Sequence, residues 1–156
     1  MKNRSFWIAA SAGLALDRVT KLWVLEALPR YETIPILRDM FHFTHVVNTG
    51  AAFSLFAGQV NWLRWLSLGV SVLLVGVAVL GPRLSRWEQV GYGLVMSGAL
   101  GNGIDRFAFG HVIDFLDFRL IQFPVFNLAD VFINAGIACL LIASLQKPSS
   151  IDRSVE

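Results

Sequence analysis

Cysteine and charged residues are scarce in this sequence. The single cysteine, Cys139, lies in an apolar run, so no internal disulfide can form and a small buried hydrophobe is its expected role. Charged residues make up 15% of the 156 residues, against roughly a quarter in a typical soluble domain. The net charge is +2 and no basic block with interleaved aromatic residues occurs, which argues against a nucleic-acid partner.

Apolar residues are abundant and gathered into long runs. They account for 55% of the chain. We therefore predict an all-α integral membrane protein in which residues 1–156 form one domain with four transmembrane helices, at about 6–28, 62–80, 88–104 and 125–145. The first run is long enough to cross a hydrocarbon core of about 30 Å. We interpret it as a span rather than as a signal peptide.

Two segments between the expected spans differ in composition. Residues 31–56 are rich in β-branched and aromatic residues with partial alternation, which predicts two or three short strands at the membrane surface. We expect a small β-sheet within 29–61 and a short loop or helix within 105–124. His42 and His45 are three residues apart, a spacing that puts them on opposite faces of a strand and argues against shared metal ligation.

Positive charge indicates the orientation in the membrane. It gathers at the N-terminus, between the second and third spans, and at the C-terminus: Lys2, Arg4, Arg83, Arg86, Lys147 and Arg153. Four spans place these regions on one side, which the positive-inside rule makes cytoplasmic. Both termini are then expected in the cytoplasm, and the segments 29–61 and 105–124 outside it.

Carboxylates within apolar segments are the strongest functional signal. Four lie close together in the sequence: Asp105, Asp114, Asp117 and Asp130. Because such groups are costly near hydrocarbon, a chain that keeps them usually uses them. Asp130 shares a helical face with Asn127 and Asn134, whereas Asp117 lies on a less apolar side and is expected to be solvated. The residues alone favour Asp130, and they favour Asp114 only narrowly over the other two.

Two neighbouring carboxylates suit peptide hydrolysis. A pair that shares one proton supplies a base to activate water and an acid to protonate the leaving amine. We predict that Asp114 and Asp130 form such a pair at the membrane surface. A metal site of His111, Asp114 and Asp130 is the chemical alternative, but no further histidine or cysteine is placed to complete the ligand set. We expect no metal and no cofactor.

Ion pairing and close packing are expected around this pair. Asp17 and Lys21 are four residues apart, so they share a helical face and can pair, and this face should point into the protein. Small residues recur at every fourth position from 93 to 101, a spacing that lets a neighbouring helix approach closely. Such packing would hold Asn102 in a fixed place.

Three further polar residues each allow two roles. Arg106 could bind a substrate carbonyl or lipid phosphate, or form a salt bridge to Asp105. Asn127 could orient an aspartate or cap the fourth helix. Asn48 could hold the substrate backbone or serve only in a turn.

Five motifs in order resemble the lipoprotein signal peptidases, the type II signal peptidases of bacteria. They extend over nearly the whole chain: DRVTK at 17–21, NTGAAF at 48–53, GNGIDR at 101–106, VIDF at 112–115 and FNLAD at 126–130. One departure is Ser97, where the family would have a glycine.

The resemblance implies an aspartic endopeptidase of the bacterial inner membrane. It would remove the signal peptide from a diacylglyceryl-modified prolipoprotein by cutting before the lipidated cysteine, with its active site toward the periplasmic face. It assigns catalysis to Asp114 and Asp130. Contact with membrane lipids and inhibition by globomycin-type cyclic peptides are also implied. Supporting or substrate-binding roles carry over to six residues: Asn48, Asn102, Arg106, Asn127, Asp17 and Lys21.

Two other functions compete with this one. In a small proton-coupled transporter, the intramembrane acids would carry protons. Transporters usually show internal repeats and bind at mid-membrane, whereas this chain has no repeat and its acids cluster toward one face. A membrane assembly factor with structural polar clusters is the third possibility.

Overall fold

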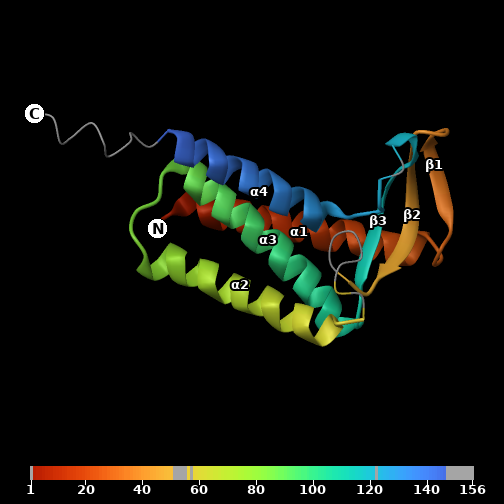
Figure 1. Ribbon diagram of the computed structural model, residues 1–156, viewed down its shortest axis with the longest axis horizontal. Coiled ribbons are helices and arrows are strands. Elements are labelled where there is room, and N and C mark those ends of the chain that lie inside the picture. Colours follow the sequence, from red (N-terminus) through yellow and green to blue (C-terminus); the bar gives the residue numbers. More distant parts are fainter. Residues whose placement is uncertain (1, 51–55, 57, 122, 147–156) are drawn as a thin grey trace, which may run out of the picture.

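The computed structural model describes residues 2–50, 56, 58–121 and 123–146. Within them, four helices run side by side and a three-stranded antiparallel sheet lies at one end (Figure 1). The start of α1 and the end of α4 lie at the opposite end. The helices are α1 (Arg4–Ala27), α2 (Val60–Leu80), α3 (Arg86–Ala108) and α4 (Leu128–Leu145). The strands are β1 (Thr33–Leu37), β2 (Phe41–Asn48) and β3 (Val112–Phe118), followed by the 3₁₀ helix η2 (Arg119–Ile121).

Helix α3 is the centre of the bundle and packs against the other three helices. Its small residues make this possible, because a Cβ on Gly93 would collide with the backbone of α1 and a Cβ on Gly98 with the backbone of α4. Ser97 occupies the position where glycine was expected, and it packs against Gly13 of α1. The predicted close packing of this helix is confirmed.

The sheet has the order β1-β2-β3 and is attached to the end of α1. Phe43 of β2 packs edge-on against Trp23 of α1, with ring centroids 5.3 Å apart. Ile113 and Phe115 of β3 join Val24 in the same buried cluster. The sheet thus sets the position of β3 relative to the helices.

The segment 105–124 differs from the expected loop or short helix. It continues α3 to Ala108 and then forms β3 and η2. Residues Val112–Phe118 pair with β2 in a register that sets Asp114 opposite Val46, with a bulge in β2 between Phe43 and Val46. The β-branched and aromatic residues of 112–118 are compatible with a strand, and long-range pairing with β2 determines it.

Two of the described helices, α2 and α4, are long and apolar enough to cross a membrane, each with a mean hydropathy of 2.1. The other two long helices carry charged residues near their middle or end, including Asp17 and Lys21 in α1 and Asp105 in α3. The arrangement of four spans therefore stays a prediction.

Candidate active site

Asp114 lies on the central part of β3 and is 2% exposed. Both oxygens of its carboxylate accept hydrogen bonds from side-chain amides. Asn48, the last residue of β2, donates from Nδ2 to Oδ2 at 2.8 Å. Asn127 donates from Nδ2 to Oδ1 at 2.6 Å. The carboxylate is thus held in one orientation by two uncharged donors from different segments.

Asp130 lies in the first turn of α4, where the local sequence forms a capping box. Its Oδ2 accepts from the backbone N–H of Asn127 at 3.2 Å, and its own N–H donates to Asn127 Oδ1 at 3.2 Å. Asn102 of α3 donates from Nδ2 to the other oxygen, Oδ1, at 2.9 Å. The start of α4 and the side of α3 together fix this second carboxylate.

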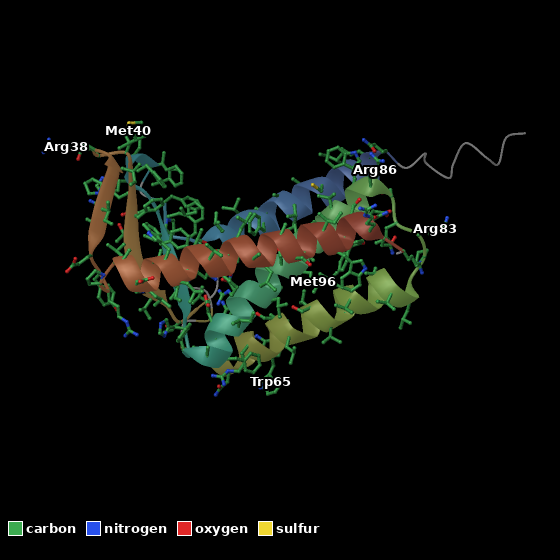
Figure 2. All side chains as sticks on the ribbon, turned by 180° about the vertical axis from the view of Figure 1, so that it is seen from behind. Arg38, Met40, Trp65, Arg83, Arg86 and Met96 are labelled. Atoms are coloured by element: carbon green, nitrogen blue, oxygen red, sulfur yellow. The ribbon has the colours of Figure 1, made fainter. Side chains whose placement is uncertain are left out.

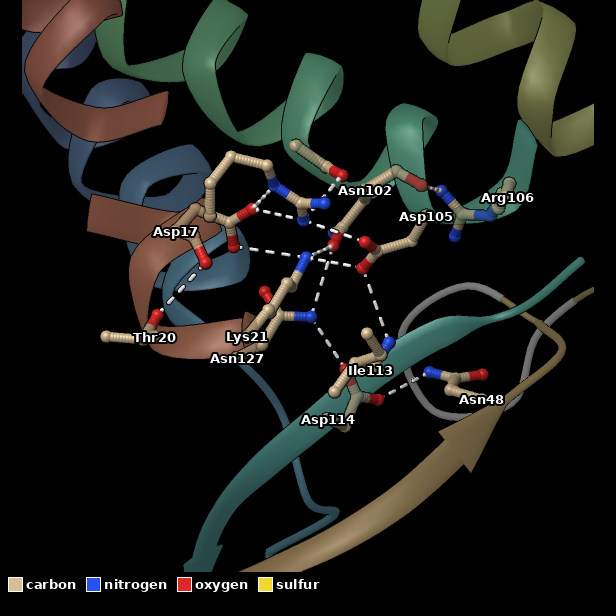
Figure 3. A network of polar contacts seen from close by, with 12 residues as sticks. Asp17, Thr20, Lys21, Asn48, Asn102, Asp105, Arg106, Ile113, Asp114 and Asn127 are labelled. Atoms are coloured by element: carbon tan, nitrogen blue, oxygen red, sulfur yellow. Dashed lines mark hydrogen bonds and ion pairs between the residues drawn. The ribbon is translucent and has the colours of Figure 1, made fainter. Parts of the chain in front are cut away.

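Asn127 connects the two aspartates. Its Oδ1 caps α4, while its Nδ2 donates to Asp114 and also to Asn102 Oδ1 at 3.1 Å (Figure 3). Both roles suggested for this residue by the sequence are therefore present at once. Asn48 has the turn role suggested for it, because its Oδ1 accepts a hydrogen bond from Gly50 N at 2.8 Å.

The environment of Asp114 favours its protonated form. Burial is the largest cause and the negative charge of Asp130 adds to it, while the amides of Asn48 and Asn127 act in the opposite direction. Together they raise the pKa of Asp114 to about 7. A carboxyl group with this pKa can hold or release a proton near neutral pH, as a general acid or base must.

An ionic cluster lies beside Asn102, between α1 and α3 (Figure 3). Lys21 Nζ lies 3.0 Å from Asp17 Oδ1 and 2.8 Å from Asp105 Oδ2. Arg18 Nη2 lies 2.8 Å from Asp17 Oδ2 and 2.7 Å from Asp105 Oδ1. The predicted Asp17–Lys21 pair and its inward direction are confirmed. Sequence reasoning missed Arg18, although a cation inside an apolar run was a usable signal.

Arg106 does not pair with Asp105, so the salt bridge considered for it is wrong. Neighbouring residues of a helix point in different directions, and Asp105 faces α1. Arg106 instead donates from Nη2 to the backbone oxygen of Gly50 at 2.9 Å. A longer contact, 3.4 Å, joins its Nη1 to Ser67 Oγ on α2. It therefore ties the end of β2 to the helices.

A cavity of about 1130 Å³ lies between α2, α3 and α4 and reaches the end of β2. Its walls are largely apolar. Five of the eight predicted site residues line it: Asn48, Asn102, Arg106, Asp114 and Asp130. Asn127 is fully buried behind them, and Asp17 and Lys21 lie in the ionic cluster. The two candidate carboxylates therefore share one apolar cavity.

Other predictions can be compared with the structure at single residues. Asp117 is not solvated: it is 9% exposed and accepts from Thr44 Oγ1 at 2.6 Å and Arg119 Nε at 2.9 Å, so that expectation is wrong. The part of the chain that the structure describes contains no group of three or more His, Cys, Asp or Glu side chains able to hold a metal. Residues 51–53 of the NTGAAF motif, together with Lys147 and Arg153, lie outside the described residues.

Fold and site together define a helical protein with two helices long and apolar enough to cross a membrane and two carboxylates, one buried and one half-buried, on one apolar cavity. A family model described as signal peptidase (SPase) II matches residues 9–146, and the chain therefore belongs to the signal peptidase II family.

Relatives and solved structures agree with this family. The lipoprotein signal peptidases of Nostoc sp. and Microcystis aeruginosa are 66% and 60% identical to the chain, over 96% of it and 94% and 97% of their own lengths. A solved structure of a bacterial membrane enzyme is similar with a TM-score of 0.84 and 27% identity, over 96% of this chain and 92% of that one. The predicted family and activity are confirmed: an aspartic-type protease that removes signal peptides from prolipoproteins.

Proposed function

We propose that Asp114 and Asp130 are the catalytic pair of this peptidase and hydrolyse the peptide bond before the diacylglyceryl-modified cysteine of a prolipoprotein. The observation that carries the proposal is the meeting of these two carboxylates, from β3 and α4, on one cavity, with Asn127 bonded to both. The two residues are distant in sequence, and the pairing of β3 with β2 places Asp114 near the start of α4.

The reaction needs one proton on the pair. The unprotonated carboxylate takes a proton from water as the water attacks the scissile carbonyl, and the protonated carboxylate donates to the leaving amine. The pair as a whole then carries one proton again, so the cycle balances. The pKa of Asp114, raised to about 7, suits such an exchange. We assign neither aspartate as the base, because the titration belongs to the pair.

The supporting residues act on the orientation of the pair. Lys21 donates from Nζ to Asn102 Oδ1 at 2.9 Å, which leaves the Asn102 amide nitrogen to donate to Asp130. Asp17 pairs with Lys21 and thereby holds it in place. Arg106, bonded to Gly50 O at the cavity wall, is placed to bind a substrate carbonyl through its remaining donors.

The membrane arrangement follows from charge and hydropathy. We propose one membrane domain over residues 1–156 with four spans in the bacterial inner membrane, both termini in the cytoplasm and the segments 29–61 and 105–124 on the periplasmic side. Arg83 and Arg86 lie at the end of the bundle opposite the sheet, as the positive-inside rule requires for this orientation (Figure 2).

The cavity also suggests the ligands. Its apolar walls between α2 and α4 suit the acyl chains of a lipid-modified substrate or of membrane lipids entering from the bilayer. A globomycin-type cyclic peptide would compete for the same space. Inhibition should therefore weaken with added substrate.

Purified protein in detergent, given a diacylglyceryl-modified prolipoprotein, tests the catalytic assignment. We expect Asp114→Asn and Asp130→Asn each to lower the cleavage rate by about 10³-fold, within the range of general acid–base catalysis. Asp117→Asn is the matched control, since Asp117 lies on the same strand but does not line the cavity. Full activity in either folded site variant would remove that residue from the mechanism.

The same assay tests the metal alternative. We expect EDTA to leave the rate unchanged, because the two carboxylates suffice for the chemistry. A reversible loss that zinc restores would favour a site containing His111.

A further inference from the structure

Asn134 is a polar side chain on the cavity wall that has no part in the proposed proton transfer. It lies on α4 one turn beyond Asp130, farther from the sheet, and is exposed to the cavity. On the facing helix, the residues that line the cavity beyond Asn102 in the same direction are Ala99 and Val95. At this depth the wall is otherwise apolar among the described residues.

The side-chain amide of Asn134 uses its nitrogen, but not its oxygen, in hydrogen bonds among the described residues. Its Nδ2 donates to the backbone oxygen of Asp130 at 2.9 Å, a bond to the preceding turn of the same helix. Within the described part of the chain its Oδ1 accepts no hydrogen bond. A free acceptor facing an apolar space is unfavourable unless a donor comes to meet it. The donor would therefore come from a molecule that enters the cavity.

The substrate itself supplies such a donor. A peptide must be extended across the aspartates for its carbonyl to be reached, and extended backbone in hydrocarbon has N–H groups without partners. Asn134 lies four residues from Asp130, or about 6 Å along the helix axis at ~1.5 Å per residue. An extended chain advances about 3.3 Å per residue. The distance corresponds to about two residues of substrate.

We propose that Asn134 binds the substrate backbone by accepting a hydrogen bond at Oδ1 from the N–H about two residues before the scissile bond. This rests on the proposed catalytic pair and orientation, because the side of the cavity farther from the sheet then receives the signal-peptide side of the substrate. The contact fixes how far the peptide slides along the cavity, and thereby which bond reaches the two carboxylates.

Ester substitution in the substrate tests the contact directly. The probes are a diacylglyceryl lipopeptide with all amide bonds and three analogues, in each of which an oxygen replaces one N–H among the three residues before the scissile bond. We expect Asn134→Leu to raise KM for the all-amide peptide about tenfold with kcat changed less than about twofold, as loss of one hydrogen bond predicts. With wild-type protein, one ester analogue should show the same increase in KM. For that analogue, Asn134→Leu should cause no further increase.

Ser144→Leu is the matched control, because it makes a similar change on an exposed position of α4 outside the cavity. It should keep the wild-type KM. The inference would be overturned if Asn134→Leu left KM unchanged. It would also be overturned if Asn134→Leu raised KM by the same factor for the all-amide peptide and for every ester analogue, because that result would indicate altered packing. Failure of the proposed function would look different: Asp114→Asn would still cleave the all-amide peptide.

Discussion

Two clusters of carboxylates lie side by side in this protein, and their partners differ. Asp17 and Asp105 are matched by two cations, Arg18 and Lys21, at distances of 2.7 to 3.0 Å. The second cluster consists of Asp114 and Asp130. Among the described residues, both of its carboxylates receive hydrogen bonds from amide groups alone, at 2.6 to 3.2 Å.

The difference separates a structural cluster from the one that we propose to be reactive. A cation beside a buried carboxylate compensates its lost hydration with opposite charge and holds it in place. An amide orients a carboxylate but brings no net charge, so burial and the neighbouring aspartate raise the pKa of Asp114 to about 7. Asn102 joins the two clusters, accepting from Lys21 and donating to Asp130. The ionic cluster thereby orients Asp130 through Asn102.

The largest stability effect should follow from breaking the ionic cluster. Asp105→Asn leaves Arg18 and Lys21 facing only one carboxylate, and we expect a loss of about 3 to 5 kcal/mol in the free energy of unfolding. At pH 7, Asp114→Asn replaces a carboxyl group whose charged form is disfavoured by burial, so its stability should stay within about 1 kcal/mol of wild type. Chemical unfolding in detergent measures both, and equal losses would remove the distinction between the clusters.

The pH dependence should distinguish the reactive cluster next. The pKa of Asp114 is about 7 in the folded protein and about 3.9 in an unfolded chain. Between these values the unfolded state binds fewer protons, so stability falls as the pH rises from about 4 to 7. We expect wild type to lose about 2 to 4 kcal/mol relative to Asp114→Asn over this range.

Unfolding curves from pH 4.5 to 8.5 measure that difference. Above pH 7 the pair loses its shared proton, so cleavage should decline on the alkaline side as well. Parallel stability curves for the two proteins would show that Asp114 titrates at an ordinary pKa in the folded state.

Much of this site could be predicted from the sequence because its signals are local. The spacing of Asp17 and Lys21 predicted their pair, and a cap was one of the two roles suggested for Asn127. Isolated carboxylates in apolar runs indicated two segments, 112–115 and 126–130, that meet at the cavity. The ordered motifs then distinguished Asp114 from Asp105, which the residues alone hardly did.

The remainder depended on contacts between distant segments. Strand β3 forms because it pairs with β2, and no pattern within 105–124 indicated that partner. Asp117 is buried by the same pairing, through Thr44 across the ladder. The direction of Asp105 toward Arg18 rather than Arg106 depends on how α3 packs against α1. Such choices between partners require the tertiary structure.

A smaller loss should follow from pushing the ionic cluster apart. A Cβ on Gly101 would collide with the Asp17 carboxylate, which Arg18 and Lys21 hold in place. We expect Gly101→Ala to cost about 1 to 3 kcal/mol, the usual range for overpacking. The control is Gly69→Ala on α2, where a Cβ meets open space and alanine favours the helix by up to about 1 kcal/mol. If both variants melt at the wild-type temperature, the packing between α1 and α3 is looser than these contacts imply.

The smallest effect should come from a third carboxylate, Asp117, whose cation is near the surface. Arg119 is 43% exposed, so the pair is partly screened by water and Asp117→Asn should cost less than about 1 kcal/mol at neutral pH. Burial opposes ionisation of Asp117, but hydrogen bonds from Thr44 and Arg119 outweigh it and hold its pKa below the usual range. The contribution is therefore present above about pH 4 and is lost as the pH falls through the folded pKa. Unfolding of this variant at pH 7 and pH 3 measures the change. A loss as large as that of Asp105→Asn would mean that burial of the carboxylate, and not of its cation, determines what an ion pair contributes here.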